Sequence, residues 1–139
     1  MKNWVVSEDK EFVSQVGEFL IQCTTIENQL QQIFEEFEND NAKRNDFSHK
    51  MLGGKIFVLA KVLKSEDIEK RLNSVKEIRN RVAHDVVSYD PVKKRAILSK
   101  LPNLNLEDEN KKASELISDL QILTLSLANK NLLETIGRQ

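Results

Sequence analysis

Two side chains in the segment 76–85, Arg79 and His84, have the types and the spacing that chemistry on a phosphate could use. A His can take up or release a proton near neutral pH, and an Arg can hold two phosphate oxygens at once. The two residues are five apart, so on a helix their side chains leave the axis about 140° apart, as neighbours. Neither task needs a metal ion, so the pair suits the cleavage of a phosphodiester such as RNA.

Arg79 borders the face of this segment that we expect to be buried. The apolar stripe consists of Ile68, Leu72, Val75, Ile78 and Val82. Arg79 cannot be neutralised by deprotonation, so a half-buried guanidinium there needs a carboxylate, several hydrogen bonds or a bound anion. Glu77 precedes Arg81 by four residues and predicts an exposed ion pair for Arg81. Because Val75 is the residue four before Arg79, Arg79 has no such partner on its own helix.

Other kinds of active site lack their signatures in this chain. It has no glycine-rich phosphate loop, no paired metal-ligand His and no nucleophile elbow. Cys23 is the single cysteine, and its place among apolar residues predicts a buried side chain, not a reactive thiol. The second His, His49, is expected to be exposed to solvent. We therefore expect no metal and no cofactor.

Composition limits how the chain could contact a nucleic acid. The 139 residues predict one domain, 1–139, and 31% of them are charged with a formal net charge of −1. Such a balance excludes binding of nucleic acid by overall charge, so an RNA contact has to come from a local patch. The densest positive run is Lys93, Lys94 and Arg95, which is either an arm that contacts phosphates or a solvated turn.

The apolar pattern predicts an all-α fold, an up-and-down bundle of four main helices with a small β-hairpin insertion between the third and the fourth. The helices are expected at about 7–37, 48–63, 65–84 and from 105 onward, and the hairpin at 86–99. Ser7, Ser65 and Asn105 have the sequence context of helix caps. The polar stretch 39–47 predicts a loop, after which Asp46 or Ser48 would cap the second helix.

Two of these helices have more apolar surface than a four-helix monomer needs. The helix at 48–63 is apolar on more than one face, and Ile122, Leu125 and Leu132 widen the apolar face of the last helix. The excess favours a homodimer. No segment has the pattern of a cleavable signal or reaches the roughly 18 apolar residues of a membrane span, and a single cysteine fits a reducing compartment. A cytoplasmic protein without a membrane partner is expected.

The hexapeptide Arg79-Asn80-Arg81-Val82-Ala83-His84 resembles the Arg-polar-x-x-x-His signature of the HEPN superfamily. The resemblance implies a helical bundle and a metal-independent endoribonuclease that works as a dimer. It assigns catalysis to Arg79 and His84 of two subunits facing each other, with Asn80 orienting them. It further implies an RNA substrate, a role as the toxin or effector of a toxin–antitoxin or phage-defence system, and a cognate antitoxin protein as partner.

Two other interpretations stay open on the sequence. The chain could be a catalytically silent HEPN-like module that binds a partner protein or a nucleotide, with Arg79 and His84 kept for structure. It could also be a helical adaptor in which the motif arises by chance and Arg79 caps a neighbouring helix. A monomer whose Arg79 is paired with an acid would point to the adaptor.

Overall fold

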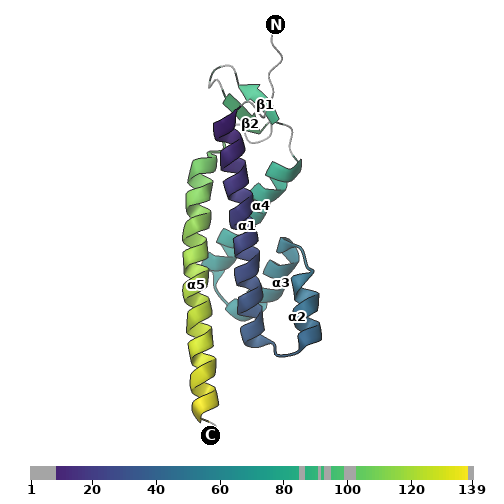
Figure 1. Ribbon diagram of the computed structural model, residues 1–139, viewed down its shortest axis with the longest axis vertical. Coiled ribbons are helices and arrows are strands. Elements are labelled where there is room, and N and C mark those ends of the chain that lie inside the picture. The colour runs from purple at the N-terminus through teal and green to yellow at the C-terminus, as the bar shows by residue number, and fades with distance from the viewer. Residues whose placement is uncertain (1–8, 85–86, 91, 93–94, 99–102, 138–139) are drawn as a thin grey trace.

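Helix α1 (Lys10–Phe37) lies at the centre of the computed structural model, which describes residues 9–84, 87–90, 92, 95–98 and 103–137 (Figure 1). Asp9 begins it, because its carboxylate accepts a hydrogen bond from the backbone amide of Phe12 at 2.9 Å. Apolar residues recur three and four apart along this segment of the sequence, which predicts a buried stripe, and Phe19, Cys23, Ile26, Leu30 and Ile33 are buried. Phe37, at the end of the helix, lies outside this buried set, with 45% of its surface exposed.

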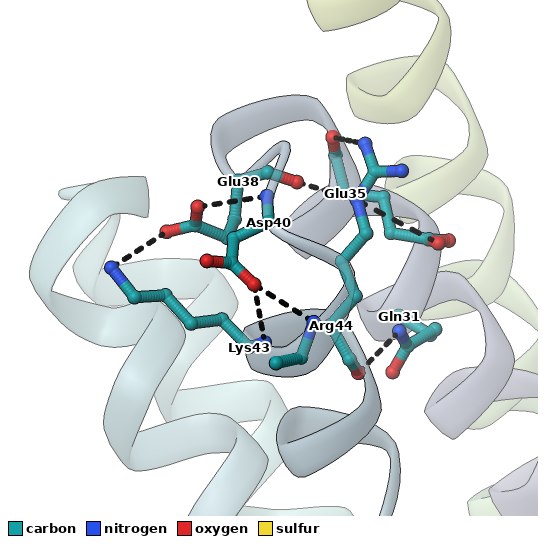
Figure 2. Close-up of polar contacts among 7 residues, drawn as sticks. Gln31, Glu35, Glu38, Asp40, Lys43 and Arg44 are labelled. Carbon is teal, nitrogen blue, oxygen red and sulfur yellow. Dashed lines mark hydrogen bonds and ion pairs between the residues drawn. The ribbon is translucent and has the colours of Figure 1, made fainter.

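A short helix, α2 (Asn41–Ser48), follows α1 and is fastened to its carboxyl end by Arg44 (Figure 2). The Arg44 guanidinium donates to the backbone carbonyl of Glu35 at 2.8 Å and to that of Glu38. Gln31 of α1 donates in return to the carbonyl of Arg44 at 3.1 Å. Carbonyls at a helix end lack partners and carry partial negative charge, so this cation satisfies both needs at once.

The prediction of a loop at 39–47 is therefore wrong. Asp40 caps α2 by accepting from the amides of Ala42 at 2.8 Å and Lys43 at 3.3 Å. Phe47 is buried and stacks on Phe34 with 4.2 Å between ring centroids. One aromatic residue in a polar stretch gives no periodic signal, so only tertiary packing explains this helix.

Helices α3 (Leu52–Leu63) and α4 (Glu66–His84) follow α2 and form a tight pair. Met51 is the N-cap of α3, in place of the predicted Asp46 or Ser48. Lys64 takes a left-handed backbone conformation, φ 50°, between the two helices, and the Ser65 hydroxyl caps α4 as predicted. A Cβ added at Gly53 would lie 3.3 Å from the Lys76 side chain, so α3 and α4 approach each other closely at this glycine.

Two short strands follow α4. Strand β1 (Val87–Asp90) pairs antiparallel with β2 (Arg95–Leu98), with Val87 opposite Leu98 and Asp90 opposite Arg95. Leu98 is buried, and β2 contacts α1. Figure 1 places this pair of strands at the end of the molecule where α4 ends and α1 begins.

Helix α5 (Leu106–Gly137) runs beside α1 for almost its whole length and in the same direction (Figure 1). Polar contacts link residues that are 95 apart along both helices. They join Asn110 to Gln15, Thr124 to Gln29 and Asn131 to Glu36, at 2.8 to 3.3 Å. A constant offset requires parallel helices, whereas an up-and-down bundle of four would place the first and the last helix antiparallel.

The chain is thus mostly helical, as predicted, with five helices in the described part. Asn105 caps α5 through the amide of Asp108 at 3.2 Å, which confirms that predicted start. Among the described residues, no helix combines the length and the apolar character that crossing a membrane requires.

Replacing Arg44 by Ala should lower the free energy of unfolding by about 1–3 kcal/mol, because two helix-end carbonyls lose a charged donor. Arg44→Lys should recover little, since an ammonium cannot reach both carbonyls as a planar guanidinium does. Urea unfolding followed by circular dichroism measures both variants. Lys43→Ala removes an exposed cation that only approaches Glu38 at 3.9 Å, and it should change little. Equal losses for the Lys43 and Arg44 variants would contradict this role of Arg44.

Candidate functional site

Helix α4 presents the three motif residues at its carboxyl end. Its buried face consists of Leu72, Val75 and Ile78. Arg79 follows directly and is half-buried, while Asn80 and His84 are exposed. The sequence therefore placed Arg79 correctly at the border of the core. His84 is the last residue of α4, about 7.5 Å further along the axis than Arg79 at 1.5 Å per residue.

The Arg79 guanidinium lies close enough to Cys23 of α1 to affect its ionisation. Burial raises the pKa of the Cys23 thiol from 9.0 to about 11, and the positive charge of Arg79 opposes part of that rise. Cys23 is fully buried, as predicted. The positive charge of Arg79 therefore acts at the contact between α4 and α1, whereas Asn80 is exposed.

Within the described part of the chain, the guanidinium of Arg79 has neither a hydrogen bond nor an ion pair. Arg71, two turns earlier on the same helix, differs in this respect. Its guanidinium contacts Asp119 of α5 at 2.7 Å and Asp67 at 3.3 Å, and the hydrogen bond to Asp119 is the main cause that raises its pKa. The fold therefore neutralises one arginine of α4 with two acids and leaves the other able to accept an anion.

Sequence reasoning missed a buried ion pair beside this position. Lys55 of α3 is buried, and its ammonium lies 3.8 Å from the carboxylate of Glu27 on α1. Glu27 also raises the pKa of Cys23, so it belongs to the same neighbourhood as Arg79. The signal was available: Lys55 stands between Leu52 and Leu59 at core spacing, and a lysine there requires an acid. Lys55 therefore already engages the carboxylate of Glu27.

Arg81, the third basic residue of the segment, is exposed. The predicted ion pair between Glu77 and Arg81 is not formed, and Glu77 instead approaches Lys76 at 3.8 Å. An exposed pair one turn apart is worth only a few tenths of a kcal/mol, so a neighbouring cation easily replaces it. Arg81 is consequently a solvated arginine two residues from Arg79, which makes it a matched control for substitutions at Arg79.

The basic run at the hairpin is only partly described. Lys93 and Lys94 lie outside the described residues, and Arg95 begins β2 opposite Asp90. The strands lie at the end of the molecule where α4 ends (Figure 1), so Arg95 and His84 belong to the same end. No contact between the run and the motif follows from this placement.

The remaining His, His49, ends α2 and is exposed, as predicted. Its ring nitrogen Nδ1 lies 2.8 Å from the carbonyl oxygen of Asn45, a local contact at the helix end. In the part of the chain that is described, no three His, Cys, Asp or Glu side chains are grouped so as to hold a metal ion.

Comparison with known protein families, with curated proteins and with solved structures finds no match for this chain.

The buried thiol should make stability depend on pH above about 9. At lower pH both states are protonated; above 9 the unfolded chain loses the Cys23 proton first, so stability falls until pH passes about 11. The free energy of unfolding of the wild type should therefore fall by up to about 2–3 kcal/mol more than that of Cys23→Ala between pH 8.5 and 11. Urea titrations across this range measure both slopes. Parallel profiles would contradict a raised pKa at Cys23.

Proposed function

We propose that this chain is a HEPN-type, metal-independent endoribonuclease that acts as a homodimer. The observation that carries the proposal is the half-buried guanidinium of Arg79, which has no acid partner within the described residues and stands five residues before the exposed His84. An adaptor with a chance motif would be expected to pair Arg79 with a carboxylate, as Arg71 is paired with Asp119.

Cleavage in this proposal transfers the phosphoryl group within the RNA. The ribose 2′-oxygen attacks the adjacent phosphorus while a base takes its proton. The bond to the 5′-oxygen breaks, and an acid protonates that leaving oxygen, which leaves a 2′,3′-cyclic phosphate and a 5′-hydroxyl. His84 is suited to either proton transfer, worth roughly 10²- to 10⁴-fold. Arg79 would hold the phosphate oxygens and stabilise the charge that develops there, and Asn80 would orient the two.

The proposal includes a homodimer because one His per chain cannot easily serve as both base and acid in a single displacement. Two copies that bring their α4 helices together would supply two His84 and two Arg79 side chains to one cleft. Beside α4, helix α3 leaves Phe57 with 67% of its surface exposed. Exposed aromatic side chains of this size are common anchors at protein interfaces, so this side of the molecule suits the proposed dimer.

A second candidate, the silent module that binds a protein or a nucleotide, has one observation in its favour. The positive charge of Arg79 acts on the thiol of Cys23 on α1, while His84 is exposed at the end of α4. If Arg79 acts only at the α1 contact in the assembled protein, it binds an anion or supports that contact without sharing a substrate with His84. Cleavage by the purified protein separates the two candidates.

The decisive experiment is cleavage of a mixed RNA substrate in EDTA by the wild type, Arg79→Ala and His84→Ala. We expect the wild type to leave 2′,3′-cyclic ends and each variant to lose at least 100-fold in rate, because each removes a group that acts in the transition state. Circular dichroism and light scattering confirm that the variants keep their fold and oligomeric state.

Arg81→Ala and His49→Ala are the matched controls, since they remove the same side-chain types from exposed positions on α4 and α2. Both should retain nearly full activity. Activity that survives in the double variant Arg79→Ala, His84→Ala would show a contaminating nuclease, and an inert wild type would favour the silent module.

We further propose that Lys93, Lys94 and Arg95 contact the RNA backbone near the motif. Replacing all three by Gln in a His84→Ala background should weaken RNA binding and reduce the slope of log K against log salt by about 2, since each phosphate that is no longer neutralised lowers it by about 0.7. Filter binding at several salt concentrations measures this slope. Replacing Lys111, Lys112 and Lys130 of α5 by Gln removes the same charge elsewhere, and equal effects of both triple variants would contradict a specific arm.

A further inference from the structure

The second half of α5 carries an apolar row on its outer face, away from α1. Its members recur three and four residues apart and are Ile122, Leu125, Asn129, Leu132 and Ile136, here called the α5 seam. The four aliphatic side chains are 56–70% exposed, and Asn129 is exposed too. Thr124 and Asn131 point the other way, since both are hydrogen-bonded to α1. Figure 1 shows none of the described helices and strands on the outer side of α5.

The spacing of the seam is that of a coiled coil. Ile122, Asn129 and Ile136 occupy positions a of the heptad, and Leu125 and Leu132 occupy positions d. Isoleucine at a with leucine at d favours two parallel strands. The first half of α5 has no such row, because its outer face carries charged and hydroxyl side chains such as Lys111, Glu115 and Ser118.

Asn129 indicates what kind of partner the seam fits. In a parallel pair in register, Asn129 of one helix faces Asn129 of the other, and the two amides can hydrogen-bond to each other. An antiparallel pair would set Asn129 against Leu125 and bury an amide without a partner. A single polar residue at position a is a known determinant of two-stranded, in-register pairing. A second copy of the seam therefore provides the best partner for both its aliphatic side chains and the amide of Asn129.

Charged side chains do not oppose this pairing. The positions beside the seam, e and g of the heptad, are Ser126, Ala128, Leu133 and Thr135, none of which is charged. The charged residues of this stretch, Lys130 and Glu134, fall at positions b and f, away from the contact. Two identical helices can approach here without like-charge repulsion.

Packing on α1 already holds α5 as a helix, so association does not have to supply the free energy of helix formation. Ten seam side chains and the helix surface beside them would bury on the order of 1,000 Å² in total, about the least area expected of a specific interface.

We propose that the α5 seam is a self-association surface through which two copies of this chain pair as a parallel, two-stranded coiled coil. The proposal does not depend on ribonuclease activity. α4 meets α5 at the contact between Arg71 and Asp119, before the seam begins, and then runs toward the hairpin (Figure 1). Pairing through the seam leaves the motif on α4 outside the interface, so it is a surface distinct from the α4 contact of the proposed active dimer.

The test is sedimentation velocity of the full chain over a range of concentrations, beside Leu125→Glu with Leu132→Glu. The double variant should shift the dissociation constant of this dimer at least 100-fold, because it places four carboxylates in one apolar contact. Ile21→Glu on α1 is the matched control, since Ile21 is 69% exposed and Leu125 is 70% exposed. Asn129→Ile should instead tighten association at least tenfold and admit larger assemblies.

Orientation is tested by cross-linking. Leu125→Cys should form a disulfide between two copies under mild oxidation, because identical d positions face each other only in a parallel pair. Ile21→Cys should not, and the buried Cys23 does not compete. A wild type that stays monomeric, or a self-association that the Leu125 and Leu132 substitutions leave unchanged, would overturn the proposal. A dimer in which Leu125→Cys fails to cross-link would overturn the parallel arrangement.

Discussion

Burial of the apolar stripe of α1 is the constraint on which the rest of the structure depends. α2, α3, α4, α5 and β2 all pack against this one helix. Five of its side chains are at most 1% exposed, and burying a large aliphatic or aromatic side chain contributes about 1.5–3 kcal/mol. α5 lies along this helix in parallel for almost its whole length, and the shorter helices and β2 pack against the parts of α1 that α5 leaves uncovered.

The same packing determines which charged side chains near the core have an oppositely charged partner. Arg71 faces α5 and meets Asp119, and Lys55 faces α1 and meets Glu27. The charge of Arg79 also acts at α1, where it affects the thiol of Cys23. A half-buried cation is costly unless an acid, an anion or solvent completes it, and no acid among the described residues pairs with Arg79, so this arginine carries the functional proposal.

The two faces of α5 carry different kinds of side chain. Toward α1 it uses amides and hydroxyls that fix the register, as in the contacts of Asn110, Thr124 and Asn131. On its outer side, the second half carries an uncharged aliphatic seam with one asparagine. Polar groups thus set the register inside the chain, and the pattern of the outer seam suits register between two copies.

Sequence patterns alone predict the helical class, the buried stripe of α1, the caps of α4 and α5, and the position of Arg79 at the border of the core. These features depend on periodicity and on short-range hydrogen bonds, which a chain encodes locally. Contacts between distant segments made residues 41–48 a helix and set α1 and α5 parallel, and among the described residues they gave Lys55 an acid partner and Arg79 none. Each of these depends on which side chains from distant segments meet, and local patterns do not specify that.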